Sequence, residues 1–351
     1  MNSILFSESP IAHFTAEVLT ENDCSYFYLY RMDTDREKIV TMAACWIKNH
    51  VFVDDSYSCA DDMDKGKQPK INTKYCRYPE DLSLLAEEDL EIVWGKEGCL
   101  AGLFCREELI CAIPYWADSS FSGYSKYSDT EAMGLYPLPL QPGNAMFPRL
   151  QESRRFWAQD FSQVWQNYQQ GFLEELENQF GKVAAYYAID GGQFPPKGLA
   201  VFQKEKYRYA FTIGVGMFPQ PSVELHREDY ENYEKIELGF CWKEDLPLEE
   251  TKVLSQMSSI VTMPWMHAAF FSHHHTIDFN SDPAHPYAVF LSDREAVQLN
   301  SSFLRRNQVD LLWLMPLGKE SYHKLATESP DYSEVDQRMA KQGIRLESLE
   351  R

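Results

Sequence analysis

The stretch KVAAYYAIDGGQFPPKGLAVFQKEKYRYAFTIGVGMFPQPSVEL, residues 182–225, sets the pattern for the second half of the chain. Side chains alternate in character from Val183 to Ile189, which is typical of a half-buried strand. Paired glycines and paired prolines interrupt this strand, and a second predicted strand runs from Tyr209 to Met217. The stretch therefore predicts two buried strands that are separated by a rigid turn.

Five residues define that turn, and we predict a structural role for all of them: Asp190, Gly191, Gly192, Pro195 and Pro196. Glycine adopts positive φ without strain, so at least one of the two glycines should do so. Proline has a fixed φ and no N–H group to offer a sheet, which stiffens the exit from the turn. We expect this geometry to place Phe194 in the core.

Taken together, these residues and later ones resemble the Suppressor of fused family in its bacterial form. Six pieces carry the resemblance: YAIDGG (187–192), FPPKGL (194–199), FPQP (218–221), VE (223–224), IEL (236–238) and VDLLWLMP (309–316). Their order and spacing make the match, which covers roughly residues 150–325. None of the pieces is a catalytic signature.

The resemblance implies a binding protein without enzymatic activity. Eukaryotic members of the family hold a peptide of a transcription factor between two lobes, as an added strand. Bacterial members are often immunity-type proteins that neutralise polymorphic toxins. Since the first 140 residues are unrelated to the eukaryotic pattern, no binding residue of the family is assigned to a position here.

The length of 351 residues makes two domains the default expectation. We predict an N-terminal α+β domain of unassigned family (1–145), a Suppressor of fused-like domain (150–325) and a C-terminal helical segment (326–351). A crossing rich in Ser, Gly, Tyr and Pro, residues 119–148, separates the two domains. The irregular mixture of strands and helices favours an α+β fold, with mixed or antiparallel sheets flanked by helices.

The net charge is −20, from 33 basic and 53 acidic residues. Such a chain repels phosphates and anionic membranes, so we expect no nucleic-acid partner. The charge suits solubility or a basic protein partner, for example a toxin domain. The N-terminus lacks a signal-peptide pattern, and no run of 18 apolar residues occurs, so we expect a cytoplasmic chain without a membrane span. The eight cysteines form no CxxC pair and are expected to be buried, reduced thiols.

The strongest predicted helix is 152–180, because aromatic and apolar side chains recur there every three or four residues. We expect this stripe to pack in the core. Two acidic groups are interpreted as surface instead. Asp61, Asp62 and Asp64 lack the glycine and the glutamate of a calcium loop, and the run from Glu224 to Glu237 is interleaved with tyrosines.

Five histidines form the one conspicuous group of metal-ligating residues: His267, His273, His274, His275 and His285. Zinc needs three or four ligands that converge on it. On an extended segment neighbouring side chains point to opposite faces, so His273 and His275 could share a metal, whereas His274 could not. No HExxH motif is present and no spaced cysteine or carboxylate completes a site, so we expect no bound metal.

Sequence signatures of common catalytic sites are missing from the chain. It has no GxSxG elbow and no GxxxxGK[ST] phosphate loop, and Gly214-Val215-Gly216 lacks the third glycine of a nucleotide fingerprint. We therefore predict a protein-binding module, not an enzyme, with no catalytic residue and no cofactor. Two alternatives remain: a metal-dependent hydrolase that uses the segment from His267 to His285, and an intracellular scaffold or regulator. The partner and the oligomeric state are left open.

Overall fold

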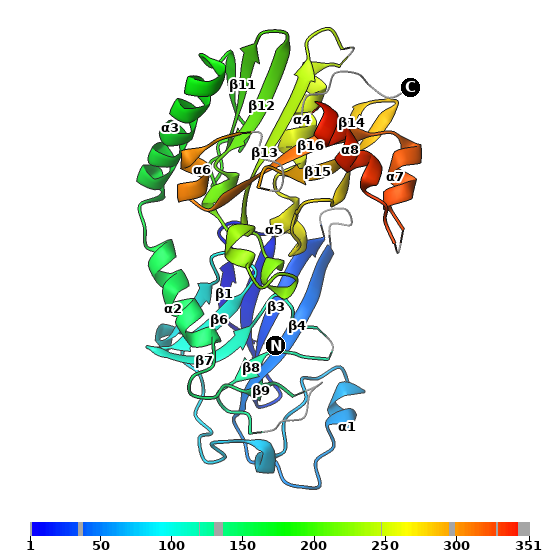
Figure 1. Ribbon diagram of the computed structural model, residues 1–351. Helices are drawn as coiled ribbons and strands as arrows, with labels where there is room; N and C mark the ends of the chain where they lie inside the picture. The colour runs from blue at the N-terminus through cyan, green and yellow to red at the C-terminus, as the bar shows by residue number, and fades with distance from the viewer. Residues whose placement is uncertain are drawn as a thin grey trace. The chain divides into compact units, whose positions relative to one another are not determined.

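The computed structural model describes residues 2–342 apart from 34–37, 119, 130–135, 247, 295–298 and 328. The chain divides into two compact units, Met1–Gln159 and Asp160–Arg351 (Figure 1). Strands and helices mix without regular alternation, and the sheets are antiparallel or mixed, so the fold is α+β, as the sequence predicts. Within the described residues, no sheet takes strands from both units.

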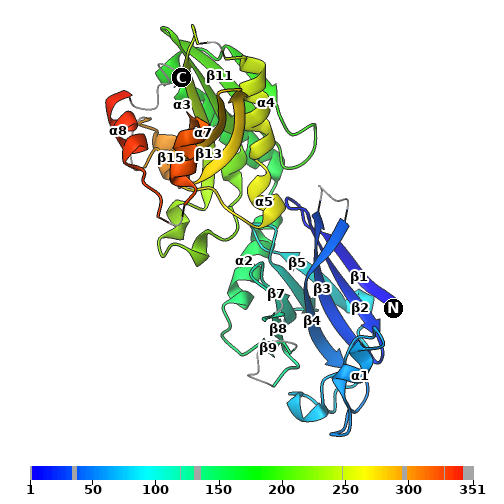
Figure 2. The same ribbon diagram turned by 90° about the vertical axis from the view of Figure 1, so that its right-hand side faces the viewer.

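Unit 1 contains two sheets that pack against each other, with β4 beside β7 and β8 (Figure 2). The first sheet is antiparallel and has the order β1 (Asn2–Glu8), β2 (Phe14–Glu21), β3 (Cys24–Asp33), β4 (Lys38–Asn49). The second has the order β5 (Leu90–Trp94), β6 (Ala101–Cys105), β7 (Glu108–Ile113), β8 (Tyr124–Ser125), β9 (Leu138–Pro139). Apolar side chains such as Phe27 and Leu103 are fully buried in this unit.

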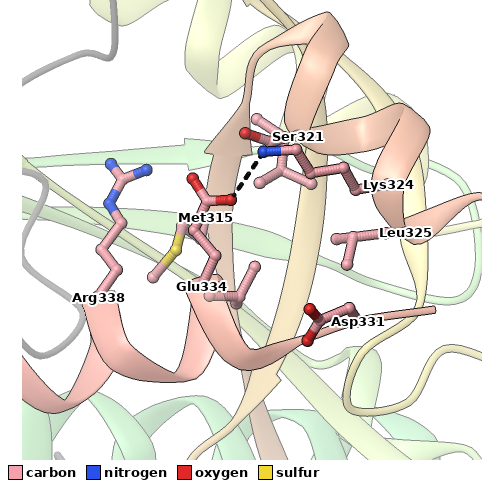
Figure 3. Close-up of a pocket in the computed structure, with 9 residues that line it drawn as sticks. Met315, Ser321, Lys324, Leu325, Asp331, Glu334 and Arg338 are labelled. Carbon is pink, nitrogen blue, oxygen red and sulfur yellow. Dashed lines mark hydrogen bonds and ion pairs between the residues drawn. The ribbon is translucent and has the colours of Figure 1, made fainter.

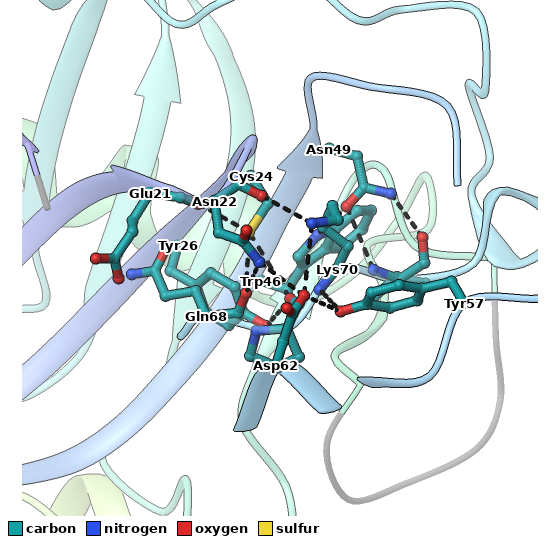
Figure 4. Close-up of polar contacts among 12 residues, drawn as sticks. Glu21, Asn22, Cys24, Tyr26, Trp46, Asn49, Tyr57, Asp62, Gln68 and Lys70 are labelled. Atoms are coloured by element: carbon teal, nitrogen blue, oxygen red, sulfur yellow. Dashed lines mark hydrogen bonds and ion pairs between the residues drawn. The ribbon is translucent and has the colours of Figure 1, made fainter. Parts of the chain in front are cut away.

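Three short helical segments complete the connections of unit 1: α1 (Cys59–Met63), η1 (Thr73–Tyr75) and η2 (Glu87–Asp89). The loop around α1 corrects one prediction. Asp61 and Asp64 are exposed, but Asp62 is only 14% exposed. Its Oδ2 accepts hydrogen bonds from Asn22 Nδ2 and Tyr57 OH, both at 2.7 Å, and lies 3.5 Å from Lys70 Nζ (Figure 4). Asp62 therefore anchors the loop to the β2–β3 turn.

The helix predicted at 152–180 is in fact two helices. α2 (Met146–Trp157) belongs to unit 1, where Leu150 is buried and Trp157 Nε1 donates to Trp94 O at 3.0 Å. α3 (Phe161–Phe180) opens unit 2, and Asp160 caps it by accepting the N–H groups of its first turn. A cap residue has non-helical backbone angles, so the aromatic stripe crosses the break while the helix does not. The division between the units accordingly falls after α2, not before residue 150.

Unit 2 is built on a seven-stranded sheet. Its order is β10 (Ala185–Ala188), β11 (Gly198–Lys204), β12 (Tyr207–Ile213), β13 (Lys235–Lys243), β16 (Val309–Leu317), β15 (His285–Ser292), β14 (Thr276–Asp282). Every pair is antiparallel except β13 with β16, which run parallel. β16 is buried along its whole length, as its continuous apolar run predicts.

Helices cover this sheet. α3 contacts β11 and β12, where the Phe180 ring lies 5.9 Å from that of Phe202 and 4.5 Å from that of Tyr209. Tyr168, Phe172 and Leu176 of its aromatic stripe are buried, as expected for core residues. α4 (Glu250–Ile260) contacts β12 and β14. The remaining helices are α5 (Met263–His267), α6 (Ser302–Arg306), α7 (Lys319–Leu325) and α8 (Ser333–Gln342). α8 lies within the predicted C-terminal helical segment, 326–351, of which residues 343–351 lie outside the described residues.

Candidate functional site: the loop end of the seven-stranded sheet

One end of the seven-stranded sheet gathers most loops of unit 2. β11 begins and β12 ends there, because Gly198 pairs with Ile213. β13 and β16 both begin there, because Lys235 pairs with Val309. The pairings of β10, β15 and β14 bring their loops to the same end. We call this region the loop end; it comprises residues 189–197, 214–234, 268–275, 293–294 and 299–308.

The turn predicted from the sequence closes the β10–β11 loop. Asp190 accepts hydrogen bonds from the N–H of Gly192 at 2.7 Å and of Lys197 at 3.0 Å, one on each carboxylate oxygen. Both glycines have positive φ, 63° at Gly191 and 78° at Gly192. Pro195 and Pro196 follow in the same loop and are half-buried. Asp190 therefore holds this loop in a closed turn. We call residues 189–197 the β10–β11 strap.

The expectation that Phe194 enters the core is wrong. Its side chain is 45% exposed. Its ring meets those of Phe161 and Phe218 at centroid distances of 5.3 and 5.7 Å, both nearly edge-on. β10 is the edge strand of the sheet, so the strap has a neighbour on one side only. Phe194 therefore covers the core cluster from outside and leaves an aromatic surface at the loop end.

Glu237 is buried, which corrects its assignment to an acidic surface run. Its carboxylate accepts four hydrogen bonds, from Tyr168 OH (2.8 Å), Thr212 Oγ1 (2.6 Å) and the N–H groups of Gly214 (2.8 Å) and Gly216 (3.1 Å). Burial raises the pKa of Glu237, while these four donors oppose the rise. The carboxylate, which belongs to β13, therefore ties α3 and β12 to the start of the loop that follows β12.

Gly214 helps to make that tie possible. Gly214 has φ of 100°, and a Cβ there would lie 2.5 Å from the Trp165 ring and 2.8 Å from Pro196 O. The chain leaves strand geometry at this residue, so the predicted strand 209–217 ends at Ile213, and η3 (Val215–Met217) follows. The β10–β11 strap and the β12–β13 connection thereby touch each other at Pro196 and Gly214.

Gln220, in the FPQP piece, is a second buried polar side chain that connects separate segments, as Glu237 does. It is 3% exposed. Its side chain donates to the carbonyl oxygens of Tyr233 and Phe271, both at 3.2 Å, and accepts the Phe271 N–H at 2.8 Å. The carbonyl of neighbouring Pro219 accepts from Trp265 Nε1 at 3.0 Å. Hydrogen bonds of the Gln220 side-chain amide therefore fix loop 214–234 to the α5–β14 connection.

Asp310, in the VDLLWLMP piece, is a third buried polar side chain of this kind. It is 1% exposed, and Ser292 Oγ lies 2.8 Å from both of its carboxylate oxygens. Arg294 Nε is 3.9 Å away. Burial raises the pKa of Asp310 to about 7, against the lowering effect of Ser292 and Arg294. On the same side of the loop end, the guanidinium of Arg227 lies 3.4 Å from the centroid of the Tyr233 ring.

The pieces that carry the family resemblance thus supply structural ties to the loop end: Asp190, Gln220, Glu237 and Asp310. Each is a polar side chain that makes hydrogen bonds to residues in or next to the loop end. Rigid loops at one end of a sheet are a common way to present a recognition surface. The exposed residues on these loops, rather than the ties, are the ones available to a partner.

The histidines do not assemble as the sequence predicts. His274 has φ of 68°, so the chain turns there, and its ring stacks on that of His273 at 3.8 Å. His275 instead faces Phe270, at a ring distance of 5.0 Å. The prediction that His273 and His275 share a face while His274 does not is therefore wrong, because it assumed an extended segment. His267 ends α5, and buried His285 begins β15, away from this stack in the chain's topology.

A carboxylate joins the stacked pair. His274 Nε2 lies 3.0 Å from Asp336 Oδ1, and Tyr332 stacks on the other face of His274 at 3.8 Å. One ligand atom from each of His273, His274 and Asp336 can lie within 4.8 Å of the others. However, His273 Nδ1 accepts the N–H of Ser292 at 3.1 Å, which puts the ring proton of a neutral His273 on Nε2. His273 then offers no lone pair to a metal, and two ligands are too few for a zinc site.

Ser292, His273 and Asp310 also lie together, but in the wrong order for nucleophilic catalysis. A catalytic serine donates its hydroxyl proton to a histidine, which a carboxylate orients. Here Ser292 Oγ bonds directly to Asp310, and His273 bonds to the backbone of Ser292. This arrangement has the geometry of a structural tie.

A hollow of roughly 310 Å³, open to solvent, lies between α7, α8 and β16 (Figure 3). Lys324 Nζ reaches Glu334 at 3.2 Å across it, and apolar Met315 and Leu325 also line it. Asp331 and Arg338 line it as well. Among the described residues, the group of three metal-ligating side chains that converge is His273, His274 and Asp336, which does not line this hollow.

Sequence reasoning missed Asp310, Gln220 and the role of Glu237.

Among the described residues, no helix is both long and apolar enough to cross a membrane. No protein-family model matches the sequence, and no curated protein is detectably similar to it.

Proposed function

We propose that this chain is a non-enzymatic protein-binding module that receives an extended segment of its partner at the β10 edge of the sheet. The open edge carries the proposal. β10 pairs with β11 and ends the strand order of the described sheet. An unpaired edge offers backbone N–H and C=O groups to an incoming strand. Its sequence AYYA has neither proline nor charge to block such pairing.

The side chains around this edge suit recognition. Tyr187 is 46% exposed on β10, and Phe194 on the neighbouring strap is 45% exposed. Tyr186 alternates to the other face, where its hydroxyl accepts from Gln169 Nε2 at 2.6 Å. A strand added at β10 would therefore pass two partly exposed aromatic rings, which favour interfaces because they bury much area at low entropic cost.

The charge of the chain favours a basic partner. The net charge is −20, and Glu228, Asp229 and Glu231 are exposed at the loop end. Complementary charge speeds encounter and selects among partners. Together with the family resemblance, this supports an immunity-type role in the cytoplasm, in which the partner is a basic toxin domain. A scaffold or regulator would use the same edge with another partner, and the two roles separate in the experiment below.

The N–H of Ala188 provides a specific test. Ile189 N donates to Lys197 O, and N–H groups alternate in direction along an antiparallel strand, so the Ala188 N–H points away from β11. Ala188→Pro removes this outward donor and keeps the β10–β11 bonds, whereas Ala188→Ser keeps the donor. We expect Ala188→Pro to weaken binding of the partner captured from native cytoplasm by about tenfold or more, and Ala188→Ser to bind like wild type.

Equal dissociation constants for the proline variant and wild type would rule out the β10 edge. The immunity role has its own measurement: co-expression with the toxin domain encoded by a neighbouring reading frame should rescue growth at one-to-one stoichiometry. Binding without rescue would favour the scaffold. Turnover of a small substrate by the purified chain alone would contradict the non-enzymatic proposal and return the hydrolase alternative.

A further inference from the structure

Two thiols meet between the sheets of unit 1. Cys45 lies on β4 of the first sheet and Cys111 on β7 of the second, and their sulfur atoms are 3.3 Å apart. Both side chains are fully buried, at 0% exposure. All eight cysteines of the chain lie among the described residues and are free thiols. This contact therefore joins two cysteines that are 66 positions apart in sequence.

The surroundings hold the two sulfur atoms in place. Cys45 Sγ also lies 3.6 Å from Tyr124 O, on β8. Gly123, with φ of 127°, allows this close approach, since a Cβ there would lie 3.2 Å from Cys45 Sγ and 2.6 Å from Ala112 O. Strands β4, β7 and β8 thus converge on the thiol pair, and no side chain separates the two sulfur atoms.

We propose that Cys45 and Cys111 are a disulfide-forming site that joins the two sheets of unit 1 when the chain meets a peroxide. A disulfide has a sulfur–sulfur bond of about 2.05 Å, so the atoms must close by roughly 1.3 Å, a shift within the reach of side-chain rotation and small strand movements. The strands already face each other, so no rearrangement of the fold is required.

The chemistry balances with hydrogen peroxide as the oxidant. One thiolate attacks the peroxide, which forms a sulfenic acid and releases hydroxide. The second thiol then displaces that oxygen as water, which leaves the disulfide. Overall, two thiols and one peroxide give one disulfide and two waters. Burial raises the pKa of Cys45 well above its ordinary value, so the attacking thiolate arises mainly when the sheets open transiently.

The proposal is tested by peptide mapping of the full chain after treatment with hydrogen peroxide. Trypsin places the two residues in separate peptides with one cysteine each, residues 39–48 and 107–126, whereas Cys99 and Cys105 share the peptide 97–106. We expect one dominant cross-linked species that joins 39–48 to 107–126 and disappears on reduction. Cys99→Ser removes another buried thiol, in the connection between β5 and β6, and should leave the link intact. Cys45→Ser and Cys111→Ser should abolish it.

A second readout follows from the cross-link itself. A disulfide that closes a long loop restricts the unfolded chain, so the oxidised protein should melt on the order of 5 °C higher than the reduced protein. The proposal is overturned if the 39–48 to 107–126 link is no more abundant than links among the other cysteines. Oxidation of both residues to sulfinic acid without a link would overturn it as well. Should Cys45→Ser and Cys111→Ser fail to fold, the maps of wild type and Cys99→Ser decide the question alone.

Discussion

Two carboxylates in the sheet of unit 2 differ in how well their charges are supported. Glu237 receives four hydrogen bonds, two of them from backbone N–H groups. Asp310 receives one serine hydroxyl, shared between its two oxygens, and one backbone hydrogen bond from Arg294, whose side chain lies 3.9 Å away. Ionisation inside a protein is costly unless donors compensate for lost water. Asp310 is therefore the better candidate for a carboxyl that exchanges its proton near neutral pH.

This difference predicts a pH dependence of stability. Asp310 ionises near its ordinary pKa of 3.8 in the unfolded chain and near 7 in the folded protein. Between these values the folded protein keeps a proton that the unfolded chain releases, so the free energy of unfolding falls as the pH rises. The total loss is on the order of 4 kcal/mol. Asp310→Asn cannot ionise and should remove this component while keeping the hydrogen bond to Ser292.

Urea unfolding between about pH 4 and about pH 8 measures the effect, because other titrating groups cancel in the difference between variant and wild type. Asp278→Asn, on exposed β14 surface, is the matched control and should change nothing. The two curves for wild type and Asp310→Asn should separate as the pH rises. Parallel curves would mean that Asp310 carries no such proton.

Some of these residues left a signal in the sequence. Asp310 stands in VDLLWLMPL, a continuous apolar run, and an acidic residue in a strand buried on both faces must itself be buried and bonded. Glu237 stands in a similar run. His274 left no such signal. Its positive φ depends on tertiary contacts, and Asp336 reaches it from 62 positions away.

At the scale of elements, apolar periodicity predicts whether a segment is a helix or a strand better than it predicts where that element begins and ends. It identified α3 and β10 but missed β11, whose residues Gly198–Lys204 follow the two prolines. The apolar run LAVF was the available signal. Breaks depend on single residues instead: Asp160 ends a continuous stripe as a cap, and Gly214 ends β12 because Glu237 holds its N–H. A pattern averaged over a window cannot show such positions.

The β10–β11 strap yields a prediction at this scale. Gly191 and Gly192 both have positive φ, and a Cβ at either would meet nothing within 4 Å. The cost of substitution is therefore backbone strain alone. Gly191→Val and Gly192→Val should each lower the free energy of unfolding by about 1–3 kcal/mol. Gly191→Asn should cost less, because asparagine tolerates the left-handed region.

Thermal melting of the three variants measures this strain. Unchanged melting temperatures for both valine variants would show that the strap contributes nothing to the stability of unit 2. A loss as large for asparagine as for valine would point to a cause other than backbone conformation.

At the scale of the whole molecule, charge should govern the rate of association. The net charge of −20 steers a basic partner over distances comparable with the Debye length, about 8 Å at physiological salt. Added salt should therefore slow association while changing dissociation much less. Stopped-flow mixing measures both rates. Neutralising Glu228, Asp229 and Glu231 together should flatten the salt dependence, and a salt-independent association rate in wild type would refute steering.

The parallel pairing of β13 with β16 bears on how unit 2 assembles. β10–β13 are neighbours in sequence as well as in space, and so are β14–β16. The two groups pair with each other only along β13 and β16, from Lys235–Val309 to Gly239–Trp313. Local hairpins form quickly, whereas joining distant segments requires a long loop to close first. The seam between β13 and β16 should therefore form in the slow step of folding. Because Glu237 and Asp310 both lie along it, the late step is also the one in which the protein withdraws two acidic groups from water.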